Sequence, residues 1–149
     1  MELSVREAFD GDKDFIRDLL RKVKLPVETV DTGTTTFYVG CDNGKSIAVA
    51  GFEFYGNDAL LRSVAIRPDL QRTGLGGRLT DWMVETAKQR GVRRIVLLTE
   101  TAEKFFARKG FKVTHRSVLD NDAMQRSTEF TSACPQTAVC MMLDIGSRH

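Results

Sequence analysis

The stretch from Val64 to Gly77 holds the residue types and spacing best suited to chemistry. An apolar run, Val64-Ala65-Ile66, leads through a short turn into Gln71-Arg72-Thr73-Gly74-Leu75-Gly76-Gly77. Glycines let a backbone approach a bound group without obstruction by a Cβ atom, and the first amides of a helix lack partners within that helix. We therefore expect the amides from Arg72 to Gly77 to hold a phosphate or pyrophosphate. The alternative is that the three glycines only shape the turn that starts a helix.

The spacing excludes two better-known phosphate loops. The pattern Gly-x-x-x-x-Gly-Lys-Ser/Thr is absent, and Gly74-Leu75-Gly76-Gly77 lacks the full spacing of the dinucleotide-binding fingerprint. No cluster of cysteine and histidine has metal-ligand spacing, so no metal is expected, and Cys134 and Cys140 are expected to be free thiols.

The composition limits the class of protein. The 149 residues include 22 Lys+Arg and 20 Asp+Glu, a formal net charge of +2, which argues against a nucleic-acid-binding surface. This length suits a single domain, expected over residues 1–145, with 146–149 as a native tail or an artificial extension. No apolar run is long enough to span a membrane, and no secretory signal is visible, so we expect a cytoplasmic protein with reduced thiols.

Alternating strand and helix patterns surround the glycine-rich stretch. A strand over 3–6 and an amphipathic helix reaching 23 precede two hairpins, the first turning at Asn43-Gly44 and the second at Gly56-Asn57-Asp58. A helix running to Gly91, a buried strand over 94–98, a helix over 100–109 and a strand over 111–115 follow. The chain then predicts a helix over 121–131 and a strand over 137–143. The order predicts an α/β or α+β domain with one mixed sheet.

These motifs resemble the GCN5-related N-acetyltransferase (GNAT) superfamily. Its signature, Gln/Arg-x-x-Gly-x-Gly/Ala after a strand, matches Val64-Ala65-Ile66 followed by Gln71-Arg72-Thr73-Gly74-Leu75-Gly76. A second signature, an alanine and an aromatic residue in a helix ending in Gly-Phe, matches Ala102, Phe105-Phe106 and Gly110-Phe111. Over nearly the whole chain, the sequence also resembles N-acetyltransferases of bacterial arsenic-resistance operons, for example in Leu97-Leu98-Thr99-Glu100-Thr101-Ala102.

The resemblance implies a GNAT fold and acetyl-CoA as the acetyl donor. The backbone of Val64, Ala65 and Ile66 is then expected to pair with the pantetheine arm, and the Ala65 amide to stabilise the oxyanion that develops on the thioester. The amides of Arg72, Thr73, Gly74, Leu75, Gly76 and Gly77 are expected to hold the pyrophosphate. Phe106 stands where many members have the tyrosine that protonates the leaving thiolate, so we expect it to pack against the CoA arm or in the core.

The reaction also requires a base that takes a proton from the acceptor ammonium. Glu53 is our first candidate and Glu100 the second, because Glu53 lies on the strand next to Val64. The alternative for Glu53 is a solvated carboxylate or one paired with Arg62. Arg62 itself could hold a carboxylate or oxyanion of the acceptor, or form an ion pair across strands.

The acceptor is expected to be the primary amine of a small molecule, with an amino-acid-like or arsenic-containing toxin as one candidate. We expect Arg62, Tyr55 and Phe130 to contact it. Residues 115–137 exceed what a tight hairpin needs, so this insert either covers the acceptor pocket or fills the sheet edge. Two alternative functions remain, an acyl-CoA-binding regulator without turnover and a protein N-acetyltransferase. The sequence does not decide between a monomer and a homodimer.

Overall fold

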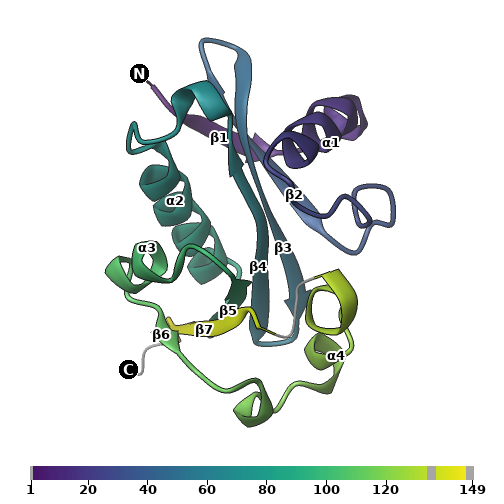
Figure 1. The fold of residues 1–149 in the computed structure, drawn as a ribbon, viewed down its shortest axis with the longest axis vertical. Helices are drawn as coiled ribbons and strands as arrows, with labels where there is room; N and C mark the ends of the chain where they lie inside the picture. The colour runs from purple at the N-terminus through teal and green to yellow at the C-terminus, as the bar shows by residue number, and fades with distance from the viewer. Residues whose placement is uncertain (1, 134–136, 147–149) are drawn as a thin grey trace. The chain divides into compact units, whose positions relative to one another are not determined.

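A computed structural model describes residues 2–133 and 137–146 of the chain (Figure 1). Its strands are β1 (Ser4–Glu7), β2 (Thr36–Asp42), β3 (Lys45–Tyr55), β4 (Asp58–Ile66), β5 (Arg94–Thr99), β6 (Lys112–Val113) and β7 (Val139–Asp144). Its helices are α1 (Lys13–Lys22), α2 (Leu75–Gln89), α3 (Glu103–Arg108) and α4 (Asp122–Gln125). The strands follow the order β1-β2-β3-β4-β5-β7-β6 in one sheet. Since β4 and β5 are parallel and β5 and β7 antiparallel, the sheet is mixed, which confirms the predicted fold class.

The chain forms two compact units. The first comprises Met1–Glu53 and Ser63–Met83, and the second comprises Phe54–Arg62 and Val84–His149. In the first unit, β1 pairs with β2 and β2 with β3, both antiparallel. The predicted turn between β2 and β3 is confirmed, because Asn43 and Gly44 adopt φ values of 50° and 78°, the left-handed conformations that such a hairpin requires.

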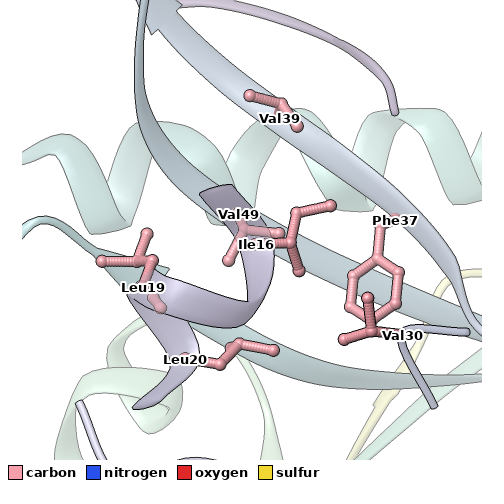
Figure 2. Packing of buried hydrophobic residues seen from close by; sticks show 8 residues of the cluster. Ile16, Leu19, Leu20, Val30, Phe37, Val39 and Val49 are labelled. Carbon is pink, nitrogen blue, oxygen red and sulfur yellow. The ribbon is translucent and has the colours of Figure 1, made fainter. Parts of the chain in front are cut away.

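Helix α1 covers one face of the strands in the first unit. Figure 2 shows Ile16, Leu19 and Leu20 of α1 turned toward Val39 and Val49 on the strands. Phe37, Val30 and Ala65 complete this buried cluster. Each side chain of this size that is removed from water contributes about 1.5–3 kcal/mol, so this cluster holds the end of β4 against α1.

Aromatic rings lie on the other face of the same strands. The ring of Tyr38 on β2 lies 5.4 Å from that of Trp82 on α2 and 6.3 Å from that of Phe52 on β3, both edge-on. Because side chains alternate along a strand, Tyr38 points away from Phe37 and toward α2. The middle of α2 thereby packs against β2.

The second unit places the insert over a face of its sheet. Leu119, Met124 and Phe130 are buried in one cluster with Leu60 of β4 and Cys140 of β7. The insert therefore covers a sheet face through side chains from several of its turns, rather than only filling an edge.

Three predicted elements differ from the structure. Residues 121–131 form two short pieces, α4 and a π-helical turn over Glu129–Ala133, instead of one helix. The helix predicted over 100–109 begins at Glu103, because the Thr99 hydroxyl accepts a hydrogen bond from the Ala102 amide and so precedes the helix. The strand predicted over 111–115 is reduced to β6, because Arg116 begins a 3-10 turn. Within the described residues, no helix is long and apolar enough to cross a membrane.

Candidate acetyl-transfer site

One residue within β4 has a backbone conformation that strands rarely adopt. Ser63 has a φ of 59° in the middle of the strand, and such a conformation costs a residue other than glycine roughly 1–3 kcal/mol. Val64, Ala65 and Ile66 follow directly. Strain of this kind is concentrated at functional sites, and the irregularity at Ser63 directly precedes the segment that the resemblance assigns to the pantetheine arm.

The loop after β4 leads the chain from the strand into α2. The Gln71 side chain donates a hydrogen bond to the Ile66 carbonyl at 3.3 Å, and the Thr73 hydroxyl donates to the Leu70 carbonyl. Arg72 and Gly74 both have positive φ values, 68° and 87°. Alternation of ordinary and left-handed conformations turns successive amides toward one side, the geometry of an anion-binding nest.

Helix α2 presents its free amides at the end of this loop. The amide of Arg78 donates to the Gly74 carbonyl at 3.2 Å, so the amides of Leu75, Gly76 and Gly77 precede the first bond within the helix. The Leu75 side chain is buried, whereas Gly74 is exposed. The residues predicted to hold the pyrophosphate therefore lie together. The buried Leu75 side chain anchors the start of the helix, and the positive end of the helix is exposed.

Glu53 lies buried in the first unit, with only 2% of its surface exposed. The Thr35 hydroxyl lies 2.9 Å from Glu53 Oε2 and 2.8 Å from the Thr29 hydroxyl. An ionised carboxylate can only accept, and a hydroxyl has a single hydrogen. Thr35 therefore donates to Glu53 when it is ionised and accepts from Thr29, so the two threonines orient one carboxylate oxygen. Sequence reasoning missed both threonines, because they lie far from Glu53 along the chain.

A cavity of about 370 Å³ opens next to this network. Thr35 lines it, together with apolar side chains such as Phe37 and Ile16 and the charged side chains of Lys13 and Asp31. Thr35 therefore both lines the cavity and contacts the candidate base.

The second unit brings together the residues predicted to contact the acceptor. Arg62 is 3% exposed and lies 3.3 Å from Glu129 through its Nη2 atom, while its Nη1 donates to the Thr128 hydroxyl at 3.2 Å. Phe130 of the insert belongs to the buried hydrophobic cluster, and the partly buried Tyr55 packs against that cluster. Sequence reasoning did not propose Glu129 as a site residue, because an acidic residue on an amphipathic helix is normally solvated.

Phe106, which the resemblance places at the position of the family's tyrosine, is buried among other aromatic rings. Phe106 is 7% exposed, and its ring lies edge-on to those of Phe105 and Phe111 at 5.0 and 5.5 Å. Phe106 therefore packs among aromatic rings, and its expected contact with the CoA arm stays a prediction. The Thr99 hydroxyl accepts from the Ala102 amide, and Glu100 is exposed.

The cysteines form no metal site among the residues described. Burial raises the pKa of the Cys140 thiol to about 11, with Arg116 opposing the shift, so this thiol stays protonated at neutral pH. Cys134 lies outside the described residues. No group of three or more His, Cys, Asp or Glu residues that could hold a metal occurs over 2–133 and 137–146.

A family model and several solved structures are similar to this chain. A family model described as an acetyltransferase (GNAT) domain matches residues 33–113, which include the β4–α2 loop and α3. Solved structures share the fold at low identity. N-acetylglutamate synthase from Neisseria gonorrhoeae, with coenzyme A and N-acetyl-glutamate, is 19% identical with a TM-score of 0.83 over 97% of this chain. This chain spans only 35% of that synthase's length.

Two further structures match along almost their full length. Rv2747 from Mycobacterium tuberculosis, in complex with CoA, is 22% identical with a TM-score of 0.80, covering 95% of this chain and 99% of that one. The ribosomal-protein-S18-alanine N-acetyltransferase from Escherichia coli is 19% identical with a TM-score of 0.77, covering 99% of this chain and 97% of that one. These proteins share the fold, yet their names give acceptors as different as an amino acid and a ribosomal protein.

Proposed function

Because this chain belongs to the GNAT acetyltransferase family, we propose that it transfers the acetyl group of acetyl-CoA to the primary amine of a small molecule. The observation that carries the proposal is the loop from Arg72 to Gly77, whose left-handed turns and free helix amides suit a pyrophosphate. Coenzyme A also occurs in two of the structures that share this fold.

The residues around the loop divide the binding of acetyl-CoA between them. The backbone of Val64, Ala65 and Ile66 holds the pantetheine arm as an added strand would, and the amides from Arg72 to Gly77 hold the pyrophosphate. Acetyl-CoA supplies a thioester carbonyl that a neutral amine attacks directly. The Ala65 amide stabilises the negative charge that develops on that carbonyl oxygen.

Glu53 receives the proton that the acceptor ammonium must lose. Its burial and the hydrogen bond from Thr35 fix the carboxylate, and positioning of this kind is a major part of catalysis by direct attack. Glu100 is exposed and has no comparable anchor among the contacts described. Phe106 has no proton to give, so water protonates the leaving thiolate or the thiolate departs unassisted, its pKa being about 8.5.

The acceptor is proposed to be a small molecule that resembles an amino acid, with an arsenic-containing toxin as one instance. Arg62 offers a planar fork of donors that matches a carboxylate or a related oxyanion. The resemblance to arsenic-resistance acetyltransferases motivates the toxin. We also propose a cytoplasmic location, because three cysteines without a recognisable disulfide pattern fit a reducing compartment.

Incubation of the purified protein with acetyl-CoA and a panel of amines tests the proposal. Mass spectrometry of the acetylated product is preferable to a thiol reagent, because the chain carries cysteines of its own. The expected result is acetylation of small amines. Binding of CoA without any product would instead support a regulator, and acetylation of peptides alone would support a protein acetyltransferase.

The Glu53→Gln variant tests the base. It retains the shape and an acceptor oxygen for Thr35, so we expect kcat to fall about 10²–10⁴-fold, the usual contribution of a general base, while the Kd for CoA stays unchanged. Glu100→Gln is the matched control and should keep full activity. An unchanged kcat in Glu53→Gln, or an equal loss in both variants, would remove Glu53 from the role.

A further inference from the structure

A buried ion pair ties the insert to β4 in the second unit. Arg62 and Glu129 expose 3% and 5% of their surfaces, and Arg62 Nη2 lies 3.3 Å from Glu129 Oε1. Removing two charges from water is costly, and an attraction in the protein interior repays this cost only with good geometry. At 3.3 Å the contact is longer than the 2.7–2.9 Å typical of charge-assisted hydrogen bonds. This contact is therefore not a short charge-assisted hydrogen bond.

The hydrophobic cluster already holds the insert in place without this pair. Met124 is fully buried and Phe130 is 4% exposed, and both belong to the cluster that includes Leu60 on β4. Arg116 adds a hydrogen bond from its Nη1 to the Phe130 carbonyl at 3.3 Å. Because apolar contacts fix the insert on both sides of Glu129 along the chain, stability alone does not account for two buried charges.

Glu129 also begins an unusual piece of backbone. It is the first residue of the π-helical turn over Glu129–Ala133, a form that is rare and occurs frequently at functional sites. Such a turn places a side chain at an angle that an ordinary helix would not give. In this chain the carboxylate of Glu129, at the start of that turn, lies 3.3 Å from the Arg62 guanidinium.

We propose that Glu129 occupies Arg62 in place of a carboxylate carried by the acceptor. On binding, the acceptor's carboxylate, or an oxyanion of similar shape, displaces Glu129 from Arg62, and the π-helical turn moves its side chain toward solvent. The proposal rests on the proposed function, and it deepens it by naming the acceptor class: amines that also bear a carboxylate or comparable oxyanion. Amines without such a group cannot displace Glu129 in this way.

The exchange preserves the charge at Arg62. With Glu129 in place, one positive and one negative charge neutralise each other, and the same balance holds when an acceptor carboxylate replaces it. A buried guanidinium left without any counter-charge would be strongly unfavourable. Glu129 thus contributes a negative charge that balances Arg62 in the free protein. The same contact makes Glu129 a competitor of the acceptor's carboxylate.

Paired acceptors make the exchange measurable. Each α-amino acid that is acetylated is compared with the amine that lacks only its carboxylate, in the wild type and in Glu129→Gln. We expect Glu129→Gln to lower KM about ten-fold for the carboxylated amine and to leave KM for its partner unchanged. Asp122→Asn, which removes an exposed acidic charge from the same insert, is the matched control and should change neither value.

A double variant keeps the test independent of misfolding. Arg62→Met combined with Glu129→Met removes both charges of this pair together, a replacement that is often neutral for stability. We expect this protein to lose the preference for carboxylated amines while its thermal unfolding stays cooperative. Retention of the preference would overturn the assignment of Arg62.

The outcomes separate this inference from the proposed function. Equal shifts of KM for both members of a pair in Glu129→Gln, or no shift, would show that Glu129 has a structural role only and would overturn the inference. If no amine is acetylated at all, the proposed function fails. Calorimetric titration of the CoA-loaded protein with the same amino acids then decides the inference, because Glu129→Gln must bind them more tightly than the wild type does.

Discussion

Replacing Gly74 by alanine tests the loop that we propose to hold the pyrophosphate. Gly74 has a φ of +87°, and a Cβ built on it meets no atom within 4 Å. The variant therefore introduces backbone strain but no steric clash. Because Gly74 is exposed and its carbonyl accepts the first hydrogen bond of α2, relief of the strain turns the amides that follow it.

The magnitude follows from two separate effects. An L-residue in the left-handed region costs about 1–2 kcal/mol, and in a domain of this size 1 kcal/mol lowers Tm by about 2–4 °C. We thus expect Tm to fall by about 2–8 °C. Loss of one hydrogen bond to a charged phosphate oxygen costs about 1.5–3 kcal/mol, which corresponds to a Kd for CoA that is about 10- to 100-fold weaker.

Gly44→Ala supplies the matched control. Gly44 has a φ of +78° and equally open space around its Cβ position, but it lies in the turn between β2 and β3. Both variants should lose similar stability in thermal unfolding, whereas isothermal titration with CoA should detect weaker binding only in Gly74→Ala. Equal Kd values for the two variants would refute the assignment of the loop to the pyrophosphate.

Two further predictions concern the second unit. Burial raises the pKa of the Asp58 carboxyl, but hydrogen bonds from Arg94 and Asn121 and the charge of Arg94 outweigh it and lower the pKa below its usual value. The resulting stability is present at neutral pH and is lost as the pH falls below about 4. Asp58→Asn should therefore be less stable at pH 7 and show a shallower acid dependence in urea unfolding from pH 7 to pH 3; an unchanged slope would contradict this. Since burial raises the pKa of Cys140 to about 11, iodoacetamide at pH 8 should label it slowly in the native protein and rapidly in urea, as mapped by mass spectrometry. Rapid native labelling would show that the thiol is accessible.

Local signals predicted much of the fold correctly. Asn43-Gly44 specified a tight hairpin because both residues tolerate positive φ, and both adopt it. The glycine-rich stretch predicted the loop and the start of α2, since free helix amides and left-handed turns are consequences of neighbouring residues alone. Such features depend on a few consecutive residues, so a single sequence is sufficient to predict them.

The helix predicted in the insert was wrong because hydrogen bonds to residues outside that segment determine its backbone conformation. The Gln125 side chain donates to the carbonyls of Arg116 and Leu119 at 2.6 and 3.2 Å, and the Asn121 side chain donates to Tyr55 and Asp58. Side-chain hydrogen bonds of this kind compete with the regular backbone bonds of a continuous helix. Hydrophobic periodicity over 121–131 predicted one helix, and the tertiary contacts divide it into two turns.

The surroundings of Glu53 depend on a glycine whose role cannot be read from its neighbours. A Cβ on Gly51 would lie 2.7 Å from Cγ2 of Thr35, which is closer than real Cβ atoms approach, so Thr35 occupies the space that Gly51 leaves. Only in that position does the Thr35 hydroxyl lie 2.9 Å from Glu53. In the sequence, Gly51 only interrupts an apolar strand. In the structure, its missing side chain leaves room for Thr35, from the loop before β2, to orient the candidate base. The orientation of the candidate base thus depends on the missing side chain of Gly51 as well as on the polar residues themselves. Reactive residue types can be recognised in a sequence, whereas the space that a distant glycine leaves for them cannot.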